Sequence, residues 1–133
     1  MKKVHFLVML LPLVFVACQK DDDTIEQDLI VRYWQIDKYY GVGGVDSTAF
    51  FNVYHGNYEI DIKAGGSYIE RYTLFGAPKV LNGSWSFINT NSTYLQLQDS
   101  AETRVFLVLA LENTGAKLKN PNADQQYWIK PKQ

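Results

Sequence analysis

The chain has 133 residues, of which 47% are hydrophobic and 20% are charged, and its formal net charge at pH 7 is −1. This composition is typical of a single globular domain and excludes an intrinsically disordered chain. The nearly balanced charge argues against nucleic-acid binding, which requires a basic surface.

The chain begins with a short apolar segment. Lys2 and Lys3 precede residues 4–17, which are almost wholly apolar, and Cys18 follows directly. The segment is shorter than the ~20 residues that a helix needs to cross a bilayer, but it suits the apolar part of a secretory signal peptide. The alternative is a buried core helix with Cys18 as a buried thiol. The flanking positive charge and the polar break after the cysteine favour the signal peptide.

This leader resembles a bacterial lipoprotein signal peptide, in which the cysteine is lipidated and becomes the first residue of the mature protein. The resemblance implies that residues 1–17 are removed and that acyl chains on Cys18 attach the protein to a membrane. A single chain binds only marginally at ~0.8 kcal/mol per buried methylene, so the two or three chains of a bacterial lipoprotein are needed for firm attachment. Cys18 is the only cysteine, so no disulfide is expected.

Residues 18–28 are expected to form the lipidated cysteine and an extended acidic tether. The charged residues that follow the cysteine directly are Lys20, Asp21, Asp22 and Asp23. Like charges at this density repel one another and bury nothing. Gln19 is similar to an outer-membrane sorting signal, and residues 20–23 resemble the acidic surface-export signal of some Gram-negative lipoproteins. We therefore expect a lipid anchor in the outer membrane, with the domain either exposed at the cell surface, if residues 20–23 act as that signal, or facing the periplasm. The alternative is that the aspartates only solvate the tether.

Residues 29–133 are expected to form one antiparallel β domain. Turn residues recur about every ten positions between segments rich in aromatic and β-branched residues, which is typical of a sandwich or barrel. The segments predicted to be strands are 30–40, 48–54, 57–63, 67–75, 80–88, 93–98, 103–112, 116–119 and 125–130. Residues 48–55 are ambiguous, because they could also form a helical turn.

Alternation of apolar and polar residues identifies the faces of several strands. Tyr58, Ile60 and Ile62 share one face of the segment 57–63, opposite three charged residues, as in a strand with one face in water. Residues 105–111 are apolar on both faces. We expect this strand to be central, with both faces covered by core, by loops or by a partner.

A series of short motifs runs through the β domain in a fixed order. They are Arg-Tyr-Trp-Gln-Ile at 32–36, a hairpin at 58–68, Asn-Gly-Ser-Trp-Ser-Phe at 82–87, Leu-Gln-Leu at 95–97, the apolar strand at 105–111, and Tyr-Trp-Ile-Lys-Pro at 127–131. This order resembles the small lipocalin-like domains of Gram-negative lipoproteins. The resemblance implies an up-and-down antiparallel β-barrel of about eight strands. Arg32 stands where the first Gly-x-Trp signature of lipocalins has glycine, whereas Gly83 and Trp85 fit the later one.

A barrel of about eight strands is either filled by its own side chains or has room for one small ligand. The residues expected to contact a small apolar ligand are Tyr68, Tyr72, Trp85, Phe87, Tyr127 and Trp128. The alternative is that such aromatics only form the core. The domain would then be a non-catalytic protein- or glycan-interaction module that uses loops and exposed aromatics. The sequence does not indicate an oligomeric state.

No pattern of residues indicates an enzyme, a metal site or a cofactor. Beyond residues 1–17, His55 is the only histidine, so a histidine-based zinc site would lack ligands. A Gly-x-Ser-x-Gly turn that would expose a nucleophilic serine is absent from the sequence. Glu59 and Asp61 share a polar strand face, where solvation explains them. We therefore expect a binding protein without catalytic activity, metal or cofactor.

Overall fold

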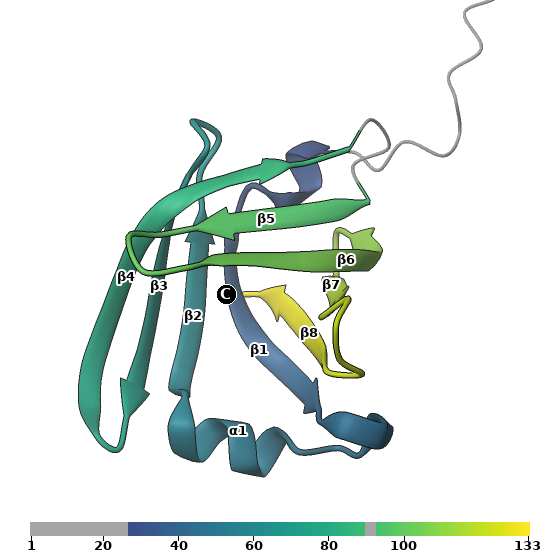
Figure 1. Cartoon of the computed structure of the whole chain (residues 1–133). Helices are drawn as coiled ribbons and strands as arrows, with labels where there is room; N and C mark the ends of the chain where they lie inside the picture. The colour runs from purple at the N-terminus through teal and green to yellow at the C-terminus, as the bar shows by residue number, and fades with distance from the viewer. Residues whose placement is uncertain (1–26, 90–92) are drawn as a thin grey trace, which may run out of the picture.

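The part of the chain that the structure describes forms eight strands that pair in sequence order and close into a barrel (Figure 1). The computed structural model describes residues 27–89 and 93–133. The strands are β1 (Tyr33–Tyr40), β2 (Gly56–Ile62), β3 (Ser67–Leu74), β4 (Ala77–Phe87), β5 (Tyr94–Gln98), β6 (Thr103–Glu112), β7 (Gly115–Lys119) and β8 (Gln126–Pro131). Each strand is antiparallel to both neighbours, and β8 pairs with β1. The predicted all-β, up-and-down antiparallel barrel is confirmed.

Short helical segments accompany the strands. Those that the structure describes are η1 (Gln27–Ile30), η2 (Val42–Gly44) and α1 (Thr48–Tyr54). Figure 1 shows η1 and α1 at opposite ends of the barrel. Over residues 27–89 and 93–133, no helix has both the length and the apolar character needed to span a membrane.

Residues 48–54 form the helix α1, so the prediction of a strand is wrong and the helical alternative holds. The Phe51 N–H donates to the Ser47 carbonyl at 2.9 Å, and the His55 N–H donates to the Phe51 carbonyl at 2.7 Å. The aromatic and β-branched residues of this segment favour a strand locally. Packing decides otherwise, because a helix places Phe51 and His55, four residues apart, on one face. Phe51 is 6% exposed on that face, whereas Phe50 is 63% exposed.

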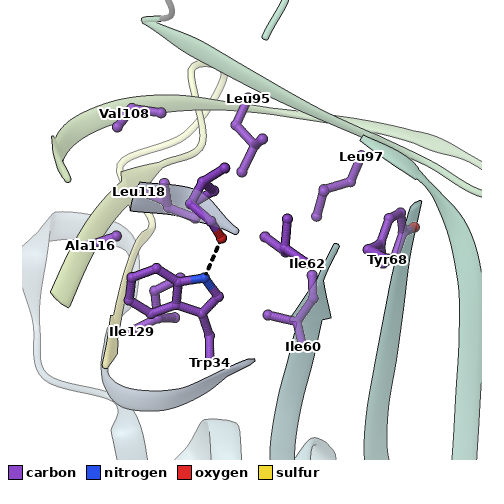
Figure 2. Packing of buried hydrophobic residues seen from close by; sticks show 11 residues of the cluster. Trp34, Ile60, Ile62, Tyr68, Leu95, Leu97, Val108, Ala116, Leu118 and Ile129 are labelled. Atoms are coloured by element: carbon purple, nitrogen blue, oxygen red, sulfur yellow. Dashed lines mark hydrogen bonds between the residues drawn. The ribbon is translucent and has the colours of Figure 1, made fainter. Parts of the chain in front are cut away.

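Figure 2 shows the core, which is built from inward-facing residues of the strands and from Ile30 of η1. Its buried apolar residues are Ile30, Trp34, Ile60, Ile62, Tyr68, Leu95, Leu97, Val108, Ala116, Leu118 and Ile129. The alternation predicted for residues 57–63 is confirmed, because Ile60 and Ile62 belong to this core and Tyr58 packs against it. The barrel interior therefore follows from the two-residue period of its strands.

The end of the barrel near η1 is closed by Trp34. Its indole N–H donates to the Ile30 carbonyl at 2.8 Å (dashed line in Figure 2), and neither residue has exposed surface. The Arg32 guanidinium lies 5.2 Å from the centre of the Trp34 ring and donates to the Asn113 carbonyl at 2.9 Å. Arg32, at the position where the resemblance would have glycine, thus ties this end of β1 to the turn between β6 and β7.

The strand β6 is apolar on both faces, as its sequence indicates, but its faces are not covered equally. Val108 is buried in the core, and Phe106 packs against that core from the inside. On the outer face Val105 and Leu107 are half-buried, whereas Leu109 is 47% exposed. The expectation that both faces are covered is therefore wrong at Leu109, as far as the described residues show. Barrel closure pairs β6 on both sides, so it does not form the open edge that would favour aggregation.

Candidate functional site

A cavity of about 220 Å³ lies inside the barrel. Its aliphatic wall consists of Ile60, Ile62, Leu95, Leu97, Leu118 and Ile129. Its aromatic residues are Phe51, Tyr58, Phe106 and Tyr127, and its polar residues are His55, Glu70, Glu102 and Arg104. The volume is below the ~300 Å³ at which pockets for drug-sized ligands begin, and it equals about seven waters at ~30 Å³ each. The cavity therefore has room for a small ligand, such as one aromatic ring with a short chain.

A charged pair crosses the barrel interior beside this cavity. The Arg104 guanidinium donates to Glu70 through two nitrogens, with Nη1–Oε1 at 3.1 Å and Nη2–Oε2 at 2.5 Å. The Glu70 side chain is only 2% exposed, and that of Arg104 is 23% exposed. Two parallel bonds are the strongest arrangement between these groups. Each charge compensates the other in a place where either alone would be costly to bury.

Further acidic groups gather around the same guanidinium. Arg104 Nη2 donates to the Tyr68 hydroxyl at 3.3 Å and lies 3.8 Å from Asp99 Oδ2. Arg104 Nε lies 3.3 Å from Glu102 Oε1, without hydrogen-bond geometry. Burial alone would lower the pKa of Arg104, but its hydrogen bonds and charge attraction with Glu70 outweigh burial and raise that pKa. Three carboxylates therefore surround one permanently charged guanidinium.

Asp99 is held as a carboxylate by the backbone that follows it. The N–H groups of Ala101 and Glu102 donate to Asp99 Oδ1 at 2.7 and 3.0 Å. These backbone hydrogen bonds lower the pKa of Asp99, with Arg104 adding to the effect. The turn between β5 and β6 thus places a negative charge at the side of the Arg104 guanidinium.

His55 and Tyr58 contribute uncharged polar groups to the cavity. His55 is stacked on Phe51 with ring centres 4.7 Å apart, and its Nδ1 is buried without a hydrogen-bond partner in the described residues. Burial lowers the pKa of His55, with the nearby Glu70 opposing this effect. Burial, followed by the charge of Glu70, raises the pKa of Tyr58 well above its usual value. Near pH 7 the imidazole and the phenol are both uncharged.

Three of the expected ligand-contacting residues belong to the cavity or lie behind its wall. Tyr127 lines the cavity. Tyr68 is only 1% exposed and connects to the site through its hydrogen bond with Arg104. Tyr72 packs against His55, with ring centres 4.8 Å apart, from outside the lining.

The other three expected residues, Trp85, Phe87 and Trp128, are not among the residues that line the cavity. Trp85 donates to the Lys63 carbonyl at 2.8 Å and packs on Phe87 with ring centres 5.8 Å apart. Trp128 alternates with the inward-facing Tyr127 on β8, and the Lys117 ammonium lies 4.1 Å from the centre of its ring.

Glu70 and Arg104 were not predicted as site residues, although the sequence contains one signal for Glu70. Glu70 shares an inward strand face with Tyr68 and Tyr72, and a charge on an otherwise aromatic face indicates a buried partner. Arg104 stands at the start of the apolar strand, where nothing in the local pattern marks it as the partner.

The membrane-anchor predictions fall elsewhere on the chain. Residues 1–17, Cys18 and the charged residues at 20–23 lie outside the described residues.

Over residues 27–89 and 93–133, no group of histidine, cysteine, aspartate or glutamate side chains could hold a metal ion.

Comparisons with known proteins bear on the fold. No family model matches the chain, and no curated protein matches it. Among solved structures, the chain is similar to a DUF4847 family protein from Bacteroides vulgatus ATCC 8482, with a TM-score of 0.56 and 10% sequence identity. The alignment covers 79% of this chain and 95% of that chain. At this identity the similarity shows a common fold and nothing about activity.

Proposed function

We propose that the protein is an outer-membrane lipoprotein, anchored by acyl chains on Cys18, whose barrel binds a small and mostly apolar ligand. The observation that carries the binding proposal is the cavity of about 220 Å³ inside the barrel. A concave site with mostly apolar walls and a few convergent polar groups is the usual form of a small-molecule site. The anchor is supported by the sequence around Cys18 alone, and export to the cell surface by residues 20–23.

The apolar wall would supply most of the affinity. Side chains such as Ile60 and Leu118 face the cavity from β2 and β7, and Phe106 faces it from β6. A ligand that covers them gains ~25 cal/mol per Å² of apolar surface removed from water, before the entropic cost of binding. The polar groups near Arg104 would then orient the ligand within the cavity.

Ligand binding can be tested by filling the cavity. The full chain, purified in a nonionic detergent, is titrated calorimetrically with the neutral compound 2-phenylethanol. Leu118→Phe adds volume at the cavity wall, and we expect it to weaken binding at least tenfold. Leu109→Phe, on the exposed outer face of β6, is the matched control and should bind like the original chain. Equal binding by both variants, or no binding across a panel of neutral apolar compounds, would contradict the proposal.

The anchor requires a separate experiment. Mass spectrometry of the full chain expressed in a Gram-negative host should show an acylated Cys18 as the first residue. Cys18→Ala should prevent acylation and leave residues 1–17 attached, so normal maturation of this variant would refute the anchor. Replacing Asp21, Asp22 and Asp23 with alanine should reduce accessibility to external protease if they direct surface export.

An exposed aromatic surface at α1 favours the alternative of a protein- or glycan-interaction module. Phe50 is 63% exposed and Phe75 is 72% exposed, and Tyr54 joins them with ring centres at 4.8 and 5.2 Å. Aromatic platforms of this kind suit sugar rings or apolar protein surfaces. A sugar panel separates the two functions. Phe75→Ser would abolish sugar binding if the surface is the site, whereas Leu118→Phe would leave it intact.

A further inference from the structure

The charge around the cavity is predominantly negative. Glu70 and Glu102 line the cavity, and Asp99 lies 3.8 Å from the guanidinium of Arg104, which is the only Lys or Arg among the lining residues. His55, the remaining titratable base of the lining, is uncharged near pH 7 because burial lowers its pKa. Three carboxylates against one guanidinium leave an excess of negative charge in a partly desolvated space. Such a site attracts cations and repels anions.

Arg104 offers little to an anionic ligand, because carboxylates already lie against its guanidinium. Both terminal nitrogens donate to Glu70, and Nη2 also donates to Tyr68. Nε has no hydrogen-bond partner in the described residues, but it faces the Glu102 carboxylate at 3.3 Å. A carboxylate ligand would have to displace Glu70 or approach Glu102 closely, and either step places like charges together.

The cavity lining also includes groups that a cationic donor can use. His55 is one of the lining residues, and its imidazole is uncharged near pH 7 because burial lowers its pKa. A neutral imidazole has one nitrogen that accepts a hydrogen bond. The rings of Tyr58 and Tyr127 lie 5.6 and 6.1 Å from the Phe51 ring, centre to centre, and all three rings line the cavity. Clustered aromatic faces attract ammonium groups.

We propose that the ligand of this cavity is a small organic amine in its protonated form, with an apolar or aromatic body. The body lies against the aliphatic wall, and the ammonium group lies near His55 and the carboxylates of Glu70 and Glu102. This inference rests on the proposed function, since it names the class of ligand that the cavity binds. It excludes fatty acids and other small carboxylates as preferred ligands.

Three compounds with the same phenyl body test the preference. The full chain in nonionic detergent is titrated calorimetrically at pH 7.5 with 2-phenylethylamine, 2-phenylethanol and 3-phenylpropanoate. We expect the amine to bind at least tenfold more tightly than the alcohol, and the carboxylate to bind most weakly. Equal binding of all three, or tightest binding of the carboxylate, overturns the inference and leaves the proposed function standing. If none of them binds, both fail.

Two variants connect the preference to named groups. Glu102→Gln removes a charge from a side chain that is 59% exposed, so the fold should be retained. We expect it to weaken binding of the amine by about threefold to fivefold, and to weaken binding of the alcohol by less, because a partly solvated charge contributes modestly. Glu112→Gln, the same change at the exposed far end of β6, is the control.

His55→Phe keeps a ring stacked on Phe51 and removes both imidazole nitrogens. Thermal unfolding of each variant first verifies that the fold is intact. We expect His55→Phe to reduce the preference for the amine over the alcohol at least threefold. An unchanged preference in both His55→Phe and Glu102→Gln would show that these groups do not select the ligand and would overturn the assignment.

Discussion

Glu70 of β3 and Arg104 of β6 are joined by two hydrogen bonds, of 3.1 and 2.5 Å, across the interior of the barrel. Two strands, β4 and β5, separate them in the pairing order. The pair therefore connects two strands across the barrel interior, whereas the backbone hydrogen bonds connect only strands that are neighbours in the sheet. It also includes Glu70, the only charged residue among the described ones that is buried as a whole residue.

Glu70→Gln should destabilise the fold. The substitution preserves shape but leaves the partly buried Arg104 charge without its closest partner. Breaking a buried pair costs ~3–5 kcal/mol, and the lower end applies here because the Arg104 side chain is 23% exposed. Chemical denaturation should therefore show a loss of about 3 kcal/mol in the free energy of unfolding.

Replacing both partners provides the control. Glu70→Met with Arg104→Met removes the buried charges together, and buried pairs exchanged for apolar residues are often neutral in stability. We expect the double variant to unfold within about 1 kcal/mol of the original chain. A double variant as unstable as Glu70→Gln would show that packing at these positions, and not charge compensation, causes the loss.

The stability of the fold should fall as the pH decreases below 6.5. Burial lowers the pKa of His55 from its ordinary value of 6.5, against the opposing charge of Glu70. Below pH 6.5, His55 therefore binds a proton more readily in the unfolded chain than in the folded chain. The contribution of His55 is complete above pH 6.5 and declines as the pH falls toward its folded-state pKa. The decline should not exceed about 1 kcal/mol per pH unit, because the ring is partly solvated.

Denaturation at pH 7.5 and 5.5 measures this effect, with His55→Phe as the comparison. The original chain should lose stability between the two values, whereas the variant should lose less. Glu59 does not interfere, because hydrogen bonds from Lys132 and Tyr33 lower its pKa below the ordinary 4.5, and its contribution is lost only at lower pH. The same loss in both proteins would show that His55 does not cause the pH dependence.

Trp34→Phe should open the closed end of the barrel. The variant loses the N–H donor to the Ile30 carbonyl, which then has no partner in a fully buried place. An unsatisfied buried acceptor and a smaller ring cost about 2 kcal/mol together. Trp128→Phe, on the outer face below Lys117, should cost less than about 1 kcal/mol. Similar losses in denaturation for both variants would contradict the role given to Trp34.

Local patterns in the sequence predict most of the fold. Residues 103–112 form a strand with the predicted bounds, and the strand predicted at 67–75 ends one residue earlier, at Leu74. These signals are local, because alternation and turn residues act within a few positions. Residues 48–54 differ, since Phe51 and His55 must fit the end of a barrel that other strands build. Tertiary packing decided that segment against its local preference.

The site was less predictable than the fold for the same reason. Which residues meet inside a barrel depends on strand register and on the stagger of closure, and neither is encoded within one segment. Glu70 could be flagged from its own strand, whereas Arg104 becomes its partner only after the barrel closes. Trp128 and Tyr127 show the converse, because adjacent aromatics on β8 lie on opposite faces of the sheet.

Gly83 stands where β4 passes closest to its neighbours, and Gly83→Ala should therefore be strongly destabilising. A Cβ at this position would lie 2.2 Å from the Gln98 carbonyl oxygen and 2.6 Å from Cε1 of Tyr68. The carbonyl belongs to the β4–β5 ladder and the Tyr68 ring is packed in the core, so neither can move without cost. Overpacking of this kind costs about 3 kcal/mol, measured as a change in the free energy of unfolding.

Gly65→Ala is the matched control for Gly83→Ala. A Cβ at Gly65 would meet nothing within 4 Å, so this variant should unfold within about 0.5 kcal/mol of the original chain. The comparison isolates contact from the general effect of replacing glycine, because both substitutions reduce the entropy of the unfolded chain equally. If Gly83→Ala were as stable as Gly65→Ala, the glycine of this Gly-x-Trp motif would not be required by close packing against Tyr68 and β5. A large difference would explain in physical terms why this position of the barrel holds glycine.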